Sequence, residues 1–334
     1  MKLKPSLLGF GLITLFYLSA LIWVDAKQHV FSGMLSVWSI LPMTIMLTML
    51  SHLIRFARWQ WLLVRAGHSP APAKSFLAYL AGFAFTATPG KVGELIRIRY
   101  LSPMGITPAR TLSAFVYERA FDLFAVLFLA VLCVNQFDVF LFAIVFGFVL
   151  LCLATIIAVS LNPYPLNRLI AYLRIINTKR LSKLIQTLRD GLVGCRLWAN
   201  PLDVFVSFFL GISAWSLCAL SFVYLLNQLQ LDIPFFISIS IYPIALLAGA
   251  ASLMPGGIGS TEATLIGVLS ANDISIDMAV LAAIGIRLST LWFSIIIGLL
   301  AVIIFEWPYR QIGQKPPQTC TLKPNAIELT KPFS

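Results

Sequence analysis

Long apolar segments dominate this sequence and limit the folds that it can adopt. Residues 5–24 and 204–226 are uncharged runs of about 20 residues, the length at which a helix crosses a bilayer. Only helices and closed barrels satisfy their backbone hydrogen bonds in lipid, and these runs are much longer than the strands of a membrane barrel. Charged residues make up 11% of the 334-residue chain, against about 25% in soluble proteins. The sequence therefore predicts an all-α polytopic membrane protein.

We expect eight hydrophobic segments, of which about six span the membrane and two are broken. The expected spans are residues 5–24, 37–54, 109–134, 137–161, 204–226 and 278–305. In the broken segments, 74–99 and 235–270, proline and glycine interrupt the apolar run. An uncleaved span suits residues 5–24 better than a signal peptide, because a small-residue cleavage site is missing and a second apolar run follows.

The two broken segments have similar sequences. The first contains TPGKVGE at residues 88–94, and the second contains PGGIGSTE at residues 255–262. In both halves an arginine follows the glutamate by 25 residues: Glu94 is followed by Arg119, and Glu262 by Arg287. Paired apolar segments interrupted by glycine and proline indicate the substrate site of a transporter built as an inverted repeat. The alternative is two ordinary loops with helix-breaking residues.

The charge distribution predicts how the chain is divided and oriented. We expect one transmembrane domain over residues 1–307, with a first half at 37–161, a second half at 204–305 and a disordered cytoplasmic tail at 308–334. If both broken segments are re-entrant, 21 of the 24 basic residues lie on the inner side, so both termini are cytoplasmic. Eight complete spans would also leave the basic loops inside.

The linker at 162–203 separates the two halves. Residues 162–200 carry seven basic residues and one acid, with leucines and isoleucines at helical spacing. This pattern is typical of an amphipathic helix on the cytoplasmic membrane surface, where its basic residues bind anionic lipids. The net charge of +11 therefore indicates inward-facing loops rather than a nucleic-acid partner.

Charged residues in or near the apolar segments are the candidate substrate ligands, because each costs on the order of 2.5–3.5 kcal/mol to insert. Glu118 and Asp122 share one helix face, and we expect one of them to pair within its own half. We also expect Arg119 and Arg287 to form two walls of one anion site. The alternative is that all these charges pair off and only lock the helices together. The predicted substrate-binding residues are Gly90, Glu94, Arg97, Glu118, Arg119, Asp122, Gly256, Gly257, Glu262 and Arg287.

Helix ends next to the glycines are expected to contribute as well. A helix that begins after a break directs free N–H groups and a positive dipole end at whatever fills the break. Ser260 and Thr261 are candidates to cap the second of these helices. Arg55 and Arg58, interleaved with Trp59 after the second span, are interpreted as an interfacial anchor. The functional alternative is that these arginines contact a lipid phosphate.

Other classes of chemistry find little support in the sequence. The five cysteines share no metal or redox spacing, and the three histidines form no metal-binding motif. We therefore expect no metal, cofactor or catalytic residue. The phosphate-binding motif G-x-x-x-x-G-K-[ST] does not occur, so we expect an ion gradient or the lipid's own gradient to drive any transport.

Taken together, these motifs resemble the membrane region of the lysylphosphatidylglycerol synthases and the stand-alone flippase-like proteins grouped with it. The resemblance covers about residues 5–305. It rests on R-x-x-R-W at 55–59, TPGKVGE-x-x-R at 88–97, ER-x-x-D at 118–122, PGGIG-x-x-EA at 255–263 and Arg287. In the full-length synthases a soluble domain follows this region, and this chain ends about 27 residues after its last expected span. The resemblance therefore implies translocation rather than synthesis.

The predicted function is flipping of a polar- or phosphate-headed lipid across the bacterial inner membrane, with the head group between the two broken segments. The lipid is a phospholipid, an aminoacyl lipid or a polyisoprenyl-phosphate-linked sugar. One alternative is an intramembrane transferase that acts on a polyprenyl phosphate, with Glu118 or Asp122 as general base. Another is a non-transporting accessory subunit, which should tolerate loss of the buried charges.

Overall fold

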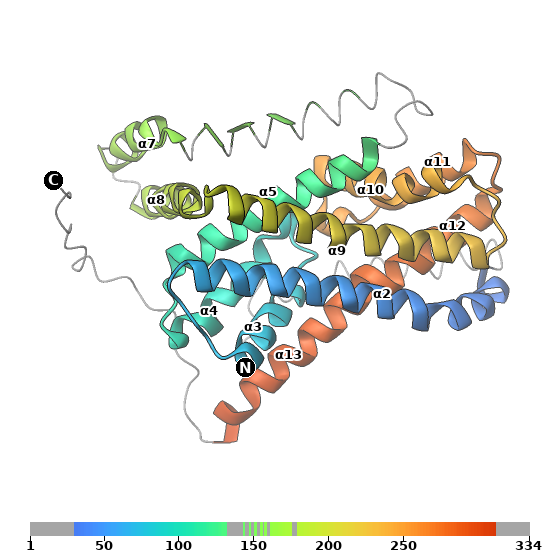
Figure 1. Ribbon diagram of the computed structural model, residues 1–334, viewed down its shortest axis with the longest axis horizontal. Helices are drawn as coiled ribbons and strands as arrows, with labels where there is room; N and C mark the ends of the chain where they lie inside the picture. Colours follow the sequence, from blue (N-terminus) through green and yellow to red (C-terminus); the bar gives the residue numbers. More distant parts are fainter. Residues whose placement is uncertain are drawn as a thin grey trace.

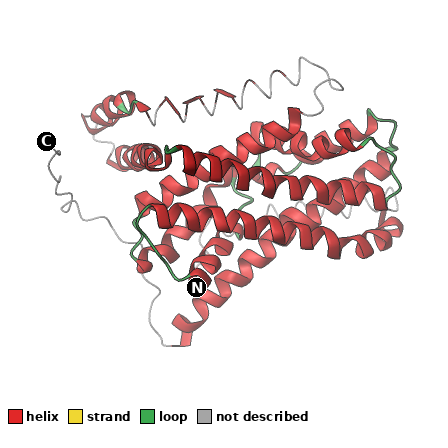
Figure 2. Cartoon of the chain, in the orientation of Figure 1, coloured by secondary structure: helices red, strands yellow, loops and turns green. Residues whose placement is uncertain are grey.

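The structure, a computed structural model, describes residues 30–131, 161–175 and 179–311 and a few positions between 143 and 158. The expected first span at 5–24 and most of the expected fourth span at 137–161 lie outside the described residues. Within the described ranges, every regular element is a helix (Figure 2). The all-α fold class is therefore confirmed.

Four long helical stretches carry the fold (Figure 1). They are α2 (Val30–Arg65), α5 (Pro108–Val131), α9 (Pro201–Gln228) and the stretch formed by α12 (Ile276–Arg287), a π-helical turn η6 (Leu288–Trp292) and α13 (Phe293–Gln311). The last helix extends to Gln311, so the first residues of the expected disordered tail are helical. Helix α2 continues well beyond the expected end of its span at residue 54.

Both expected breaks are present. The first broken segment consists of α3 (Pro72–Phe83), a 3₁₀ segment η1 (Pro89–Ile96), α4 (Arg97–Leu101) and a 3₁₀ turn η2 (Ser102–Met104). The second consists of α10 (Phe235–Ala251), a 3₁₀ turn η5 (Pro255–Gly257) and α11 (Ser260–Ser270). The linker forms α7 (Tyr164–Ile175), α8 (Lys179–Gly194) and a 3₁₀ turn η4 (Cys195–Trp198).

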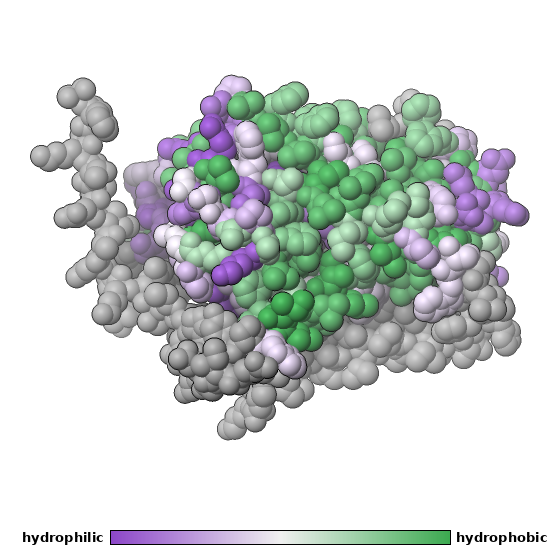
Figure 3. All heavy atoms as spheres, turned by 60° about the horizontal axis from the view of Figure 1, so that its bottom comes forward, coloured by the Kyte–Doolittle hydropathy of each residue, from purple (hydrophilic) through white to green (hydrophobic). Residues whose placement is uncertain are grey.

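The described helices have the length and composition of a membrane protein. Three stretches are long and apolar enough to cross a bilayer, namely Val37–Arg65, Pro201–Gln228 and Ile276–Trp307. Helix α5 has 24 residues, but Glu118, Arg119 and Asp122 lie near its centre. On the face shown in Figure 3, a broad apolar band lies between hydrophilic side chains at the two ends of the molecule.

The two halves are arranged with opposite directions. Helices α2 and α9 lie side by side, and in Figure 1 the first runs from right to left and the second from left to right. Helix α3 packs against α13, the last helix of the other half, and α10 packs against α5 in the same reciprocal way. The two breaks, η1 and η5, contact each other. This reciprocal packing is what an inverted repeat predicts.

Close backbone contacts hold α3 and its break in place. Gly298 on α13 lies so near the end of α3 that a Cβ atom there would be 2.2 Å from the backbone nitrogen of Ala84. The linker is fixed to the helix ends, because Trp198 donates a hydrogen bond to the carbonyl oxygen of Leu62 at 3.0 Å and accepts one from Tyr117 at 2.9 Å. Both contacts position α2 and α5, which carry most of the charged residues described below.

Candidate functional site

The two breaks have the same backbone conformation. Gly90 and Gly256, each following a proline, adopt left-handed φ angles of 61° and 63°, a region that glycine enters at little cost. The next residue is also left-handed in both halves, with φ of 56° at Lys91 and 65° at Gly257. Lys91 donates its backbone N–H to the carbonyl oxygen of Thr88, and Gly257 donates to the equivalent Met254, both at 2.9 Å. The similarity in sequence is therefore also a similarity in structure.

The first break is joined to a buried cluster of charges. Arg97 bridges two carboxylates, with Nη2 3.0 Å from Glu94 Oε2 and Nη1 3.1 Å from Glu118 Oε2. Glu118 also accepts a hydrogen bond of 2.8 Å from the hydroxyl of Tyr79, and Glu94 accepts one of 2.9 Å from Thr86. Glu94, Arg97 and Glu118 are all buried. As expected, Glu118 pairs within its own half.

Arg119 and Asp122 extend this cluster toward α2. Arg119 Nη2 lies 2.9 Å from Asp122 Oδ2, and Arg119 Nη1 lies 3.9 Å from Glu94 Oε1. Asp122 also pairs with Arg55 at 3.3 Å and with Arg58. Together these residues make one network of four arginines and three carboxylates, which leaves one positive charge in excess. Its members are Arg55, Arg58, Arg97, Arg119, Glu94, Glu118 and Asp122.

The interpretation of Arg55, Arg58 and Trp59 as an interfacial anchor is wrong. All three side chains are buried in the protein, and the two arginines neutralise Asp122 and Glu118. A buried unpaired carboxylate is strongly destabilising, and Arg97 and Arg119 alone are too few for three acids. That imbalance was the signal in the sequence that these arginines face inward.

The second break has a much smaller charged group. Arg287 Nε lies 2.6 Å from Glu262 Oε1, and its Nη2 donates to the carbonyl oxygen of Gly256 at 2.8 Å. The other carboxylate oxygen of Glu262 accepts the N–H of Gly259 at 2.7 Å. Glu262 therefore caps α11, and the expectation that Ser260 and Thr261 cap it is wrong, since neither makes a side-chain capping bond.

Two adjoining pockets lie where the breaks meet. The first, here called the apolar pocket, encloses about 290 Å³. Its wall includes Leu123, Val126, Trp215, Leu247 and Met254. The second, the polar pocket, encloses about 80 Å³, and its wall includes Thr48, His52, Arg55, Glu94, Tyr242 and Ser294. Lys91, Trp215, Leu246 and Gly256 line both pockets and so form the boundary between them.

The predicted ligands are divided between these pockets. Gly90, Arg119, Asp122, Gly256 and Gly257 line the apolar pocket, whereas Glu94, Gly256 and Arg287 line the polar one. Arg97, Glu118 and Glu262 line neither and hold other residues in place. Arg119 and Arg287 therefore do not form two walls of one pocket as expected. In each half, however, the glutamate and the arginine 25 residues later lie within ion-pair distance.

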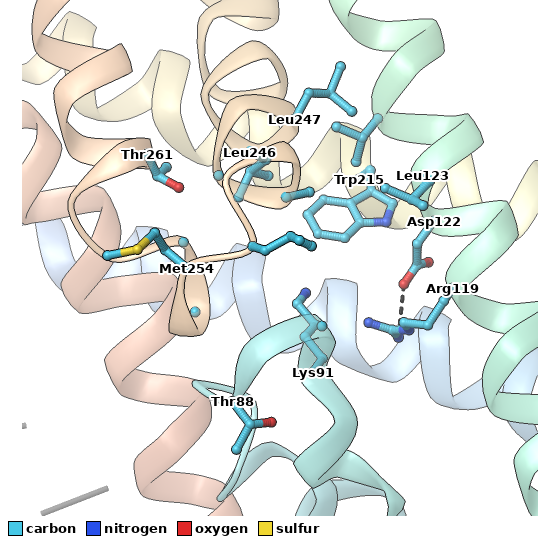
Figure 4. A pocket seen from close by; sticks show the side chains of 17 residues that line it. Thr88, Lys91, Arg119, Asp122, Leu123, Trp215, Leu246, Leu247, Met254 and Thr261 are labelled. Carbon is cyan, nitrogen blue, oxygen red and sulfur yellow. Dashed lines mark ion pairs between the residues drawn. The ribbon is translucent and has the colours of Figure 1, made fainter. Parts of the chain in front are cut away.

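Lys91 is the functional candidate that the sequence analysis did not single out. Its side chain extends from η1 into the space between the breaks, and the Arg119 guanidinium points toward the same space from α5 (Figure 4). Its ammonium lies 5.8 Å from the centre of the Trp215 ring. Among the residues that the structure describes, no carboxylate oxygen lies within 4.0 Å of it. The available signal was a lysine in a position where the matching segment has glycine.

Comparison with known proteins identifies the family. Residues 6–298 match the family model described as the lysylphosphatidylglycerol synthase TM region. This chain belongs to that family. It is also similar to two archaeal proteins described as UPF0104 membrane proteins. The one from Methanothermobacter thermautotrophicus is 24% identical over 86% of this chain and 90% of its own length. The one from Methanocaldococcus jannaschii is 25% identical over 80% of this chain and 84% of its own length.

Membership of the lysylphosphatidylglycerol synthase transmembrane-region family agrees with the membrane helices described above. The matched range, 6–298, includes both breaks, the charged cluster and both pockets. The site is therefore part of the region that defines the family and not an addition to it.

Proposed function

We propose that this member of the family translocates a phosphate-bearing lipid between the two leaflets of the bacterial inner membrane and catalyses no reaction. The observation that carries the proposal is the ammonium group of Lys91, which lies without an ion-pair partner among the described residues at the boundary between an apolar and a polar pocket. Lys91 is partly buried, and a cation held beside an apolar pocket is costly and therefore points to an anionic ligand.

The backbone of Lys91 supports a functional role. A left-handed conformation costs a non-glycine residue about 1–2 kcal/mol, and Lys91 adopts it with φ of 56°. The matching position in the second half is Gly257, which avoids this strain. Strained residues of this kind concentrate at functional sites, so a lysine here is better explained by its ammonium than by the fold.

Arg119 provides a second contact for the same phosphate. Its side chain is 15% exposed, more than that of any other arginine in the cluster, and it lines the apolar pocket with Lys91. Its buried Nε and Nη2 atoms donate no hydrogen bond within the described residues, although Nη2 lies close to Asp122. A planar guanidinium suits a phosphate, because it can donate two parallel hydrogen bonds. The acyl or isoprenyl chains would lie along the apolar wall and in the surrounding lipid.

The arrangement of the carboxylates argues against the transferase alternative. A general base needs a carboxylate that is free to accept a proton from the substrate. Glu118 is bound by Tyr79 and Arg97, and Asp122 by Arg58 and Arg119. These contacts favour a scaffold role for both acids. An accessory protein would have no need for a lysine between two pockets that lacks an ion-pair partner among the described residues.

The orientation and the energy source are part of the proposal. The positive-inside pattern favours cytoplasmic termini, with α7 and α8 on the anionic inner leaflet. Because the sequence has no ATP-binding motif, an ion gradient or the lipid gradient drives transport. The two oppositely directed breaks would give the head group access from the two sides in turn.

Reconstitution in vesicles tests this proposal. Vesicles would contain phosphatidylglycerol with a fluorescent acyl chain, and a membrane-impermeant quencher would report the outer-leaflet fraction over time. We expect the wild-type protein to accelerate flipping, Lys91→Met to slow it at least about tenfold, as expected from the loss of a charge-assisted bond, and Lys91→Arg to retain part of it. Lys74→Met, which removes an exposed lysine of α3, is the matched control and should flip normally. Equal rates with and without wild-type protein would refute the proposal.

A further inference from the structure

We infer that the polar pocket binds a hydroxyl group of the lipid head, and that the protein thereby favours phosphodiester lipids with hydroxyl-bearing heads. The inference rests on the proposed function, since it places the substrate phosphate at Lys91. It concerns a different set of atoms, which line the polar pocket and not the apolar one, although Lys91 lines both. Several polar groups of this pocket have no hydrogen-bond partner among the described residues.

The hydrogen bonds of Ser294 assign the tautomer of His52. The Ser294 hydroxyl contacts the carbonyl oxygen of Thr290, and this contact is a hydrogen bond only if Ser294 donates. His52 Nε2 lies 2.8 Å from the same hydroxyl oxygen, which must then accept from the ring. A neutral imidazole that carries its hydrogen on Nε2 has an acceptor at Nδ1. His52 Nδ1 is buried and has no hydrogen-bond partner among the described residues.

Two other groups of this pocket that belong to α2 are also buried without a hydrogen-bond partner among the described residues, and a third, the indole Nε1 of Trp215, lies where the two pockets meet. One is the hydroxyl of Thr48, which lies one helical turn before His52 on α2. The other is Nε of Arg55, a donor on the same helix. The Cζ atom of Arg55 lies 5.6 Å from the centre of the Phe83 ring, and the centre of the His52 ring lies 4.5 Å from it. Arg55 and His52 are therefore near neighbours. Unsatisfied buried polar groups are rare in native proteins and need an explanation.

A hydroxyl matches this set of groups better than the other head-group functions do. It can donate to His52 Nδ1 and at the same time accept from Arg55 Nε. An ammonium has no acceptor for Arg55, and a carboxylate has no donor for His52. Tyr242 adds a further acceptor, because its own hydrogen is donated to Thr290 at 3.0 Å.

The position and size of the pocket set the kind of head group. It shares Lys91 with the apolar pocket, so a group that enters it is attached directly beyond the phosphate. Its volume of about 80 Å³ equals the liquid volume of roughly two or three waters. A short hydroxyl-bearing group, such as the end of a glycerol or one edge of a sugar, fits this space.

Two lipids that differ only in hydroxyl groups test the inference. Phosphatidylglycerol and phosphatidylpropanol have the same phosphodiester charge and a three-carbon head, but the second lacks both hydroxyls. With the same fluorescent acyl chain, we expect wild-type protein to flip phosphatidylglycerol about tenfold faster, since phosphatidylpropanol leaves the polar groups of the pocket unpaired. The shift in melting temperature of the detergent-solubilised protein with each lipid measures binding separately.

The double variant Thr48→Val with His52→Phe tests whether the polar pocket causes the preference for phosphatidylglycerol. Phenylalanine keeps the ring against Phe83, and valine keeps the shape of threonine, but the unpartnered groups of residues 48 and 52 are removed while Arg55 is left unchanged. We expect this variant to flip the two lipids at rates within about threefold of each other. His68→Phe, in the loop after α2 and outside both pockets, is the control and should keep the preference.

The possible failures can be told apart. If wild-type protein flips both lipids at the same rate, the polar pocket holds only water and the inference is wrong, while the proposed function stands. If it flips neither lipid, the proposed function fails, and the melting-temperature shifts with the two lipids then test whether the polar pocket binds a hydroxyl. A rise in melting temperature with phosphatidylglycerol alone would then support the hydroxyl site, and equal shifts with both lipids would overturn it.

Discussion

The two broken segments share one backbone turn but differ in the charges around it. Gly90 and Gly256 have φ angles within a few degrees of each other. Glu94, however, belongs to a buried network of seven charged residues, whereas Glu262 has one arginine partner and a side chain that is 15% exposed. The first break is therefore fixed by many ion pairs, and the second by few. This difference indicates that the first break forms a rigid platform. If the protein transports lipid as proposed, we expect the second break to be the part that rearranges.

The largest expected effect comes from breaking the charged network of the first half. Asp122→Asn removes one of three buried carboxylates that four arginines share. Breaking such a buried pair typically costs about 3–5 kcal/mol, so we expect a clear fall in melting temperature and in the amount of protein in the membrane. Asp190→Asn, in a pair that is partly exposed on α8, should change stability by less than about 1 kcal/mol. Similar melting temperatures for both variants would contradict the interpretation of the first break as a rigid platform.

A smaller effect should separate the two glycines. Alanine at either position takes the same left-handed strain, about 1–2 kcal/mol. A Cβ atom at Gly256 would also lie 3.2 Å from the Cα atom of Ala87, whereas at Gly90 the nearest atom would be 3.8 Å away. We therefore expect Gly256→Ala to lower the melting temperature more than Gly90→Ala. The reverse order would show that the two breaks do not pack on each other as described.

The next prediction concerns Arg287, the main tie on the second break. Its guanidinium reaches Glu262 and the carbonyl oxygen of Gly256 together, and a lysine cannot reproduce this fork. Because Arg287→Lys keeps the charge, we expect only about 1 kcal/mol of lost stability, the value of one hydrogen bond, but a marked loss of lipid flipping. If the melting temperature falls as far as in Asp122→Asn, the second break is as rigid as the first.

The sequence predicted the features that depend on local composition or on repetition. Proline and glycine within apolar runs located both breaks, and the shared 25-residue spacing related the two halves, but it was not interpreted as the ion pair that each half forms. The spacing did not predict how far each pair is embedded in other charges, because Arg55 and Arg58 come from a helix outside both motifs.

The errors have a common physical reason. An arginine beside tryptophan at the end of an apolar run has the same local pattern whether it faces the membrane surface or a distant carboxylate. Arg58 faces Asp122, which is more than 60 residues away in the sequence. Similarly, a single histidine in an apolar helix, such as His52, has no local signal, and its role depends on Ser294 at the far end of the chain. Lys91 was visible within the first motif, but its strained φ and the pockets beside it depend on how the two halves meet.

The smallest expected effect on stability, and the most direct test of the comparison, is at Lys91. This residue and Gly257 occupy matching positions with φ of 56° and 65°, so Lys91→Gly makes the first break like the second. Glycine relieves about 1–2 kcal/mol of left-handed strain and loses about 0.4–1 kcal/mol through the greater freedom of the unfolded chain. We therefore expect the variant to be as stable as wild type or up to about 1 kcal/mol more stable. Lipid flipping should fall at least about tenfold, because the ammonium is lost. Thermal unfolding and the vesicle assay on the same preparation measure both quantities.

A variant that is stable and inactive would mean that the lysine is kept for the substrate at the expense of the fold. A variant that flips lipid normally would mean that the two breaks are equivalent, and that the phosphate is bound elsewhere.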